Sequence, residues 1–245
     1  MPWPPWSKQK AAQAPSPTRQ TQPKWTCQPA AFGSLQNAPR CIASHPGSNK
    51  NEGMSVVWQY SAGTRQQLST QLFAQIGRYR HDIFIQQLNW GLNAVDGMEL
   101  DEFDGPDAVY VCAHDEGGQV SGVARLLPTT APYLMEKAFP QLWGGQQLPR
   151  DPKIWELSRF AATSSHPGEA IGHQASALHA SELLHRVMRV ASMLGAQMLI
   201  TVSPVGMERL LRLNAFHAMR NGAPAWVGGE LLVSLSIHGN PRGPI

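Results

Sequence analysis

A short apolar run near the middle of the chain carries three side chains that could take part in chemistry. They are the carboxylate of Glu156, the hydroxyl of Ser158 and the guanidinium of Arg159, with apolar residues such as Trp155 between and beside them. This pattern predicts a strand over residues 154–161 that is buried on both faces. Burying an ion without a partner costs several kcal/mol, so Glu156 and Arg159 are each expected to have a partner or a ligand.

Four further charged residues could meet that strand, namely Arg80, Asp101, Asp104 and Arg125. The two aspartates lie in an acidic, turn-rich segment over residues 93–107, which is either a solvated loop or a site for a cationic ligand. This segment lacks the spacing of a calcium loop, and the chain has no zinc-protease, phosphate-loop, dinucleotide or serine-hydrolase motif, so no metal site is expected. No histidine base lies near the serine of the apolar run, which argues against a nucleophilic role for it.

Hydrophobic periodicity predicts the elements that must position these residues. Helical spacing over 64–88, with Gly77 as a joint between two helices, places Arg80 and Phe84 on one face. A Gly-Gly turn between β-branched runs predicts a hairpin over 108–127. The other expected elements are helices over 134–139, 173–194 and 206–213 and strands over 154–161, 198–202 and 231–237. Because strands and helices alternate in the second half, we expect one α/β domain with a mixed, twisted sheet flanked by helices.

The first 53 residues differ in composition from the rest. They hold nine of the 20 prolines, and their charge is +5 (6 − 1), whereas residues 54–245 carry −2 (14 − 16). A segment without helical or strand periodicity cannot offset its ordering entropy, so we expect a disordered extension over 1–53 and a folded domain over 54–245. Met54 directly precedes a strand-like run, and we hypothesise that translation starts there. Peptides from residues 1–53 in mass spectrometry of the native protein would contradict this.

Charge and composition also exclude several classes of protein. The folded part lacks a dense basic patch, which argues against nucleic-acid binding. No run approaches the ~20 apolar residues of a membrane span, and the N-terminus lacks the apolar core of a secretory signal, so we expect a cytoplasmic protein without membrane insertion. Cys112, inside a strand-like run, is expected to be an inert small hydrophobe.

Four sequence segments occur in a specific order. They are Arg78-Tyr79-Arg80-His81-Asp82-Ile83-Phe84 with Trp90, Glu99-Leu100-Asp101-Glu102-Phe103-Asp104, Ala124-Arg125-Leu126-Leu127-Pro128-Thr129-Thr130 and Trp155-Glu156-Leu157-Ser158-Arg159-Phe160. In this order they resemble the acyl-homoserine-lactone synthases, the LuxI-type autoinducer synthases, and the resemblance covers residues 54–238. It implies a fold similar to the GNAT acyltransferases. The implied reaction joins S-adenosylmethionine to the acyl group of an acyl carrier protein, giving an N-acyl-homoserine lactone quorum-sensing signal and methylthioadenosine. S-adenosylmethionine is then a substrate, and no cofactor is implied.

The resemblance carries nine site residues over to matching positions. It implies catalytic roles for Arg80, Glu156, Ser158 and Arg159 and substrate-binding roles for Phe84, Trp90, Asp101, Asp104 and Arg125. An α-amino group has a pKa of about 7.7–8.0, so a modest base suffices, and Glu156 is expected to serve. Asp101 and Asp104 would complement the cationic groups of S-adenosylmethionine, and Arg125 or Arg80 its carboxylate. The two aromatic residues would wall the site, although core packing explains them equally well.

The acyl chain and its donor give less specific expectations. Candidates for an apolar acyl tunnel, which core packing also explains, are Met135, Phe139, Trp143, Leu178, Thr201, Ser203 and Met207. A hydroxyl at Thr201 would favour a 3-oxo chain. Basic residues that could meet an acidic carrier protein are Lys153, Arg186, Arg189, Arg209 and Arg212. The alternative function is a GNAT-type N-acyltransferase that uses acyl-coenzyme A, although its R-x-x-G-x-G/A phosphate turn is absent between 160 and 245; a decayed synthase that only binds S-adenosylmethionine is a third reading.

Overall fold

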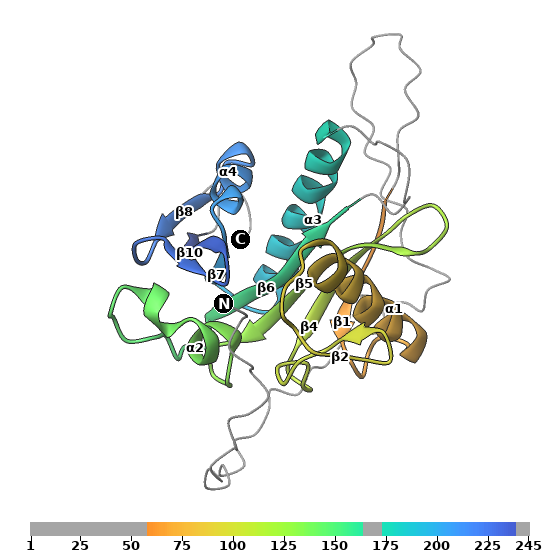
Figure 1. Ribbon diagram of the computed structural model, residues 1–245, viewed down its shortest axis with the longest axis horizontal. Helices are drawn as coiled ribbons and strands as arrows, with labels where there is room; N and C mark the ends of the chain where they lie inside the picture. Colours follow the sequence, from red (N-terminus) through yellow and green to blue (C-terminus); the bar gives the residue numbers. More distant parts are fainter. Residues whose placement is uncertain (1–57, 164–172, 239–245) are drawn as a thin grey trace, which may run out of the picture. The chain divides into compact units, whose positions relative to one another are not determined.

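A computed structural model describes residues 58–163 and 173–238 of the chain. The boundary expected at residue 53 and the start expected at Met54 lie outside the described residues. The main sheet has eight strands in the order β1-β4-β5-β6-β7-β10-β8, and β9 pairs with β10 (Figure 1). The strands are β1 (Gln59–Thr64), β4 (Val109–His114), β5 (Val120–Pro128), β6 (Ile154–Ala162), β7 (Met198–Pro204), β8 (His217–Arg220), β9 (Ala225–Val227) and β10 (Glu230–His238). A separate hairpin pairs β2 (Ala94–Val95) with β3 (Met98–Glu99).

Helices cover both faces of this sheet. They are α1 (Thr70–Arg80), which continues as the π-helix η2 (His81–Gln87), α2 (Leu134–Ala138), the 3-10 helix η3 (Pro140–Trp143), α3 (His173–Met193) and α4 (Gly206–Leu213). From α1, Phe73 packs edge-on against Tyr110 of β4, whereas Leu183 of α3 packs in the core with Val109 and Val111 on the other face of the same strand. Alternate residues of a strand face opposite sides, so α1 and α3 sandwich the sheet.

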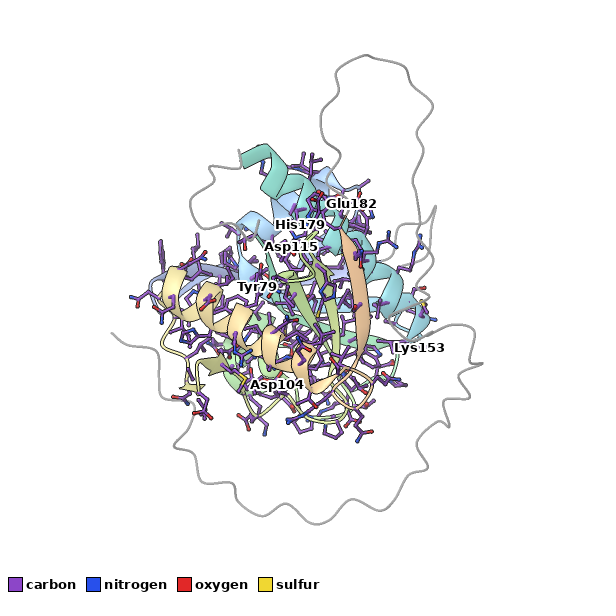
Figure 2. All side chains as sticks on the ribbon, turned by 90° about the vertical axis from the view of Figure 1, so that its right-hand side faces the viewer. Tyr79, Asp104, Asp115, Lys153, His179 and Glu182 are labelled. Carbon is purple, nitrogen blue, oxygen red and sulfur yellow. The ribbon has the colours of Figure 1, made fainter. Side chains whose placement is uncertain are left out.

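Both covering helices hydrogen-bond to one backbone carbonyl, that of Ser121 at the start of β5. Tyr79 of α1 donates its hydroxyl to the oxygen of Ser121 at 2.9 Å, and Nε2 of His179 of α3 hydrogen-bonds the same oxygen at 3.0 Å. Figure 2 labels both side chains and shows the sheet edge between the two helices. Among the described residues, no helix is long and apolar enough to cross a membrane.

The strands β6 and β7 form the one parallel pair among the described strand pairs of the main sheet, and they pair only briefly. The register joins Ile154 to Met198, and it ends where Glu156 pairs with Ile200. Beyond that point β6 continues to Ala162 beside β5 alone, while β7 continues beside β10 (Figure 1). The carboxylate of Glu156 therefore lies at the point where the two strands part.

The sequence predicted most long elements correctly, and the expected class, α/β with a mixed sheet flanked by helices, is confirmed. Two local expectations were wrong. Gly77 is not a joint, because α1 runs through it; a Cβ there would approach the Cβ of Met98 to 2.9 Å, so the glycine permits close packing against β3. The segment 93–107 is not all loop, since it contains the β2–β3 hairpin, whose turn residues Asp96 and Gly97 both have positive φ.

Two adjacent glycines after η3 give a matched test of how this segment docks. Gly144 and Gly145 have φ values of 69° and 75°, so an added side chain is strained at either position. A Cβ at Gly144 would also lie 2.3 Å from the backbone oxygen of Asn221, whereas nothing lies within 4 Å at Gly145. We expect Gly144→Ala to cost about 1–3 kcal/mol more unfolding free energy than Gly145→Ala, the usual range for overpacking. Urea unfolding measures the unfolding free energy of both variants. Equal losses of unfolding free energy would mean that the backbone at Asn221 moves away from the new Cβ at no cost.

Candidate active site

The second half of β6 is shaped by a bulge at Arg159. The register with β5 joins Arg125 to Ser158 and Val123 to Ala161, so two residues of β6 stand opposite Ala124. Arg159 has a φ of 50°, a left-handed conformation that costs a non-glycine residue about 1–2 kcal/mol. Bulges of this kind redirect side chains, and they are common beside active sites. The strain at Arg159 must therefore be offset by the contacts of its side chain.

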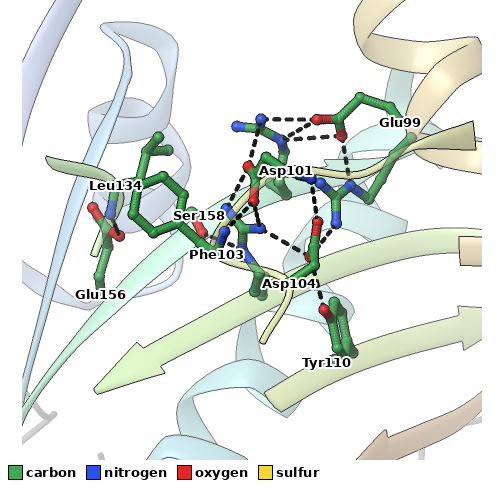
Figure 3. A network of polar contacts seen from close by, with 11 residues as sticks. Glu99, Asp101, Phe103, Asp104, Tyr110, Leu134, Glu156 and Ser158 are labelled. Carbon is green, nitrogen blue, oxygen red and sulfur yellow. Dashed lines mark hydrogen bonds and ion pairs between the residues drawn. The ribbon is translucent and has the colours of Figure 1, made fainter. Parts of the chain in front are cut away.

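Those contacts belong to a network in which three arginines meet three carboxylates (Figure 3). The guanidinium of Arg159 donates from Nη2 to Glu99 and to Asp101, each at 2.9 Å. The ion pairs of the network are Arg80 with Glu99 and Asp104, Arg125 with Asp101 and Asp104, and Arg159 with Glu99 and Asp101. The five charged residues predicted from the sequence at 80, 101, 104, 125 and 159 thus lie together. Glu99, which the sequence placed in the acidic segment without a role, completes the charge balance.

The carboxylate of Asp104 accepts hydrogen bonds from four different residues. Its Oδ1 accepts hydrogen bonds from Arg80 at 2.7 Å, Arg125 at 2.9 Å and the hydroxyl of Tyr110 at 2.7 Å, and its Oδ2 accepts from the backbone N–H of Asp101 at 2.7 Å. Its side chain is 4 % exposed, and those of Arg80 and Arg125 are fully buried. Tyr110 had no role in the sequence-based site.

The arginines of the network hold Glu99 and Asp104 in the charged form. Burial alone would raise the pKa of Glu99, but Arg159 and Arg80 outweigh burial and lower that pKa to about 2. Burial would likewise raise the pKa of Asp104, and Arg80 and Arg125 hold it well below its usual range. Among the described residues, no group of three or more His, Cys, Asp or Glu side chains is arranged to hold a metal ion.

An aromatic pair lies against the edge of the network. The rings of Phe84 and Trp90 stack with centroids 5.0 Å apart and planes 18° apart, and the guanidinium carbon of Arg159 lies 5.6 Å from the centre of the Phe84 ring. The π-helix η2 and the positive φ of Asn89 bring Trp90 back so that its N–H donates to the oxygen of Phe84 at 2.8 Å. Short π-helical turns are frequent at functional sites. Phe84 therefore lies beside Arg159, and Trp90 lies against Phe84.

Glu156 lies beside the network but has different partners. Its Oε2 accepts the backbone N–H of Leu134 at 2.7 Å and its Oε1 that of Met135 at 2.6 Å, both from the start of α2. Within the described part of the chain it makes no ion pair, so the partner expected for its buried carboxylate is a pair of backbone N–H groups rather than a charged side chain (Figure 3). Burial raises the pKa of Glu156 to about 7, against the lowering effect of the two N–H groups and of Arg125.

Ser158 and the expected tunnel residues divide between the two faces of the sheet. The hydroxyl of Ser158 accepts a hydrogen bond from Nε of Arg125 at 3.1 Å. Thr201 and Ser203 hydrogen-bond each other and share the face of Leu199, which is the face covered by α3, whereas Glu156 faces the other side with Ile200. A path that joined these hydroxyls to Glu156 would have to pass between β6 and β7 where they part.

The other tunnel candidates fall into three groups. Met135, Phe139 and Trp143 are buried in and after α2, on the side of Glu156. Met207 of α4 is half-buried against the α3-side core. Leu178 of α3 is 59 % exposed, so its side chain faces solvent rather than an apolar wall.

Comparison with known proteins decides the family. The model of the autoinducer synthase family matches residues 64–237, which include every member of the network. The chain belongs to the autoinducer synthase family. An acyl-homoserine-lactone synthase of Acinetobacter nosocomialis is 43 % identical over 177 residues, which cover 72 % of this chain and 97 % of that protein. The activity of the chain is accordingly that of an acyl-homoserine-lactone synthase, an acyltransferase of quorum sensing.

Solved structures of the autoinducer synthase family agree with this assignment. TofI, in a ternary complex with an inhibitor and methylthioadenosine (MTA), is 37 % identical with a TM-score of 0.64, covering 74 % of this chain and 91 % of that one. BjaI, a coenzyme A-dependent acyl-homoserine lactone synthase solved with S-adenosylmethionine and isopentyl-CoA, is 28 % identical with a TM-score of 0.66, covering 76 % and 85 %. Autoinducer synthases therefore include at least one that is coenzyme A-dependent.

The strained backbone at Arg159 gives a prediction within this synthase. Arg159→Ala and Arg159→Gly both remove the guanidinium, but only glycine adopts a φ of 50° without cost. We expect the glycine variant to be more stable than the alanine variant by about 1–2 kcal/mol in denaturant unfolding. Equal stabilities would mean that the bulge relaxes once the side chain is gone.

Proposed function

We propose that the chain makes an N-acyl-homoserine lactone from S-adenosylmethionine and an acyl group carried by acyl carrier protein, releasing methylthioadenosine. The observation that carries the proposed mechanism is the Glu156 carboxylate, 1 % exposed, with a pKa of about 7, at the point where β6 and β7 part. A base with that pKa matches a substrate α-ammonium of pKa about 7.7–8.0. Neither the acid nor the base is then far from its titration range at neutral pH.

The proposed sequence of steps follows from this geometry. Glu156 takes a proton from the α-ammonium, and the freed lone pair attacks the thioester carbonyl carbon. The oxyanion collapses to the amide as the thiolate leaves, and the second proton of the nitrogen passes to the departing thiolate. The backbone N–H groups of β6 beyond its pairing with β7 are the candidate donors to that oxyanion. The methionyl carboxylate then attacks the carbon next to the sulfonium, which closes the lactone and breaks the carbon–sulfur bond to release methylthioadenosine.

The exposure of the charged residues separates two roles. Arg80, Arg125 and Asp104 are buried, and Asp104 accepts hydrogen bonds from both arginines, so we assign them to a framework that holds the site. Nη2 of Arg80 is buried without a hydrogen-bond partner and lies 3.9 Å from Asp101. Asp101, whose side chain is 19 % exposed, is the network carboxylate best placed to meet a cationic group of the substrate. Arg159 and the stacked pair of Phe84 and Trp90 would border the nucleotide.

Support for a carrier-protein donor comes from exposed basic residues. Arg209 and Arg212 are exposed on α4, and Lys153 and Arg189 are exposed elsewhere in the second half of the chain. Arg186 is half-buried, with its guanidinium 4.9 Å from the ring centre of Tyr60, and is less available to a partner. Basic side chains of this kind attract an acidic protein surface. The alternative donor is an acyl-coenzyme A, since BjaI is a coenzyme A-dependent synthase.

The test is product analysis with matched donors. The chain is incubated with S-adenosylmethionine and with the same acyl groups on acyl carrier protein or on coenzyme A, and mass spectrometry follows the lactone and methylthioadenosine. We expect lactone from both at high concentration and a higher kcat/KM with the carrier protein. Lactone formed with the coenzyme A thioesters but not with the acyl carrier protein would show that the donor is an acyl-coenzyme A. Binding of S-adenosylmethionine without lactone from either donor would contradict the whole proposal.

A further inference from the structure

The short helix α2 begins directly at the carboxylate of Glu156. The residue before the helix, Tyr133, provides no side-chain hydrogen bond to the free N–H groups of the first turn. Glu156 of β6 accepts these hydrogen bonds instead, from the backbone N–H groups of Leu134 and Met135 at 2.7 and 2.6 Å. Such N–H groups have no partner inside a helix, so a carboxylate that accepts both is bound at two points.

The start of α2 is itself fixed on both sides. The hydroxyl of Tyr133 donates to the backbone oxygen of Pro149 at 2.9 Å, and the Tyr133 side chain is fully buried. Met135 is also fully buried, and the hydroxyl of Ser234 on β10 donates to its sulfur at 3.8 Å. The two N–H groups therefore point at Glu156 from a segment that is anchored to both the following loop and the sheet.

The two hydrogen bonds from α2 leave the carboxylate of Glu156 able to accept a proton. A carboxylate has about four lone-pair sites, and the two N–H groups occupy one on each oxygen, so one site on each remains. We propose that the backbone N–H groups of Leu134 and Met135 are positioning groups for Glu156, which fix the plane of its carboxylate and stabilise its charged form for proton transfer. This inference rests on the proposed role of Glu156 as base, and it assigns α2 a part in the reaction that its side chains alone do not suggest.

Other charged and titratable groups act on Glu156 from the surrounding elements. Arg125 on β5 lowers the pKa of Glu156, and Asp101 raises it. Tyr133 lies before α2 and is close enough to Glu156 for their charges to interact. Burial raises the pKa of Tyr133 most, and the negative charges of Glu136 and Glu156 raise it further. Since burial is the largest effect on Glu156 and the N–H groups of Met135 and Leu134 oppose it most, removing one N–H should raise the pKa further.

The test removes one N–H with little other change. Leu134 is the first residue of α2, a position where proline is well tolerated, and Tyr133 before it has φ −134° and ψ 163°, the extended conformation that proline requires of its predecessor. Leu134→Pro deletes the N–H, and Leu134→Ala is the matched control that trims the side chain but keeps the N–H. Single-turnover amide formation is measured from pH 5.5 to 9.5 for wild type and both variants.

We expect the acid limb of the rate profile to move up by about one pH unit in Leu134→Pro, as for a lost hydrogen bond to a charged group, and to stay in place in Leu134→Ala. The rate of the proline variant should then recover at high pH. A loss of active protein that is the same at every pH does not move the midpoint of the limb, and circular dichroism of each variant over the same pH range shows whether the folded fraction changes with pH. An unchanged midpoint, or a rate lowered equally at every pH, would overturn the inference.

A second variant covers failure of the proline variant to fold. Replacing Leu134 by its α-hydroxy acid changes the N–H to an ester oxygen and keeps the side chain, and the same shift is expected. The proposed base is tested separately by Glu156→Gln. If that variant retains wild-type amide formation, the proposed function of Glu156 fails. If Glu156→Gln loses the rate but the acid limb stays in place in both variants that lack the N–H of residue 134, only the positioning role fails.

Discussion

Replacing the carboxylate of Glu156 by an amide, Glu156→Gln, is expected to slow amide-bond formation by about 10²–10⁴-fold, the range typical of a lost general base. The change keeps the shape of a fully buried side chain and removes the group that accepts the proton. S-adenosylmethionine binding should change far less than the rate, because the arginines and carboxylates of the network do not hydrogen-bond Glu156 among the described residues. Single-turnover kinetics with saturating substrates separate the two quantities.

The pH profile distinguishes a lost base from a damaged site. Wild type should show an acid limb near pH 7, since burial raises the pKa of Glu156 to about 7. The residual rate of Glu156→Gln should lack this limb. A variant that keeps the wild-type limb, or turns over at the wild-type rate, would show that another group takes the proton.

A structural side effect of the same variant can be measured independently. The amide nitrogen of glutamine would face one of the two N–H donors of α2, and two donors cannot bond each other, so the helix should loosen locally. Stability also depends on pH with a definite sign. The folded-state pKa of Glu156 is raised from 4.5 to about 7, so the stabilisation from its protonated form is complete below pH 4.5 and is lost as the pH rises through 7. Wild type should lose stability relative to the variant across that window.

The sequence predicted the long elements because their patterns are strong and local. The hairpin of β4 and β5, the helix α3 and the strand β6 each have a clear period or turn. It missed β8 and β9, of four and three residues, which lack a clear alternation and depend on β10 for pairing. It also missed the π-helix η2, because α-helical spacing was assumed across Arg80 and Phe84.

Within the site, the sequence predicted which side chains would lie together but not which of them support the site and which contact the substrate. Buried arginines require carboxylates, which agrees with the partners expected for Arg159, but the choice of Asp101 as the shared partner of Arg125 and Arg159 is visible only in the fold. The partners of Glu156 are backbone N–H groups, which every residue but proline carries, so no sequence signal marks Leu134 or Met135. Exposure, which separates a framework from a substrate contact, also exists only in the folded chain.

Asp104→Asn is expected to destabilise the fold by about 3–5 kcal/mol, as for the loss of one partner from a buried ionic network. Three arginines balance three carboxylates, and the substitution leaves one buried positive charge uncompensated. Asparagine also presents an NH2 group where Oδ2 accepted the N–H of Asp101 at 2.7 Å. Urea unfolding measures the loss, and Asp107→Asn on the exposed side of the same segment is the matched control, expected within about 0.5 kcal/mol of wild type.

At acidic pH, the unfolding free energies of wild type and Asp104→Asn should become more similar. The folded-state pKa values of Glu99 and Asp104 are depressed. The stabilisation from Glu99 is therefore present above its ordinary pKa of 4.5 and is lost as the pH falls through about 2, and that from Asp104 is lost in the same direction. If Asp104 belongs to the framework, the molecules of the variant that remain folded should bind S-adenosylmethionine nearly as wild type does. A variant as stable as the Asp107 control but with much weaker substrate binding would instead place Asp104 in contact with the substrate, and the division between framework and substrate contacts would have to be redrawn around it.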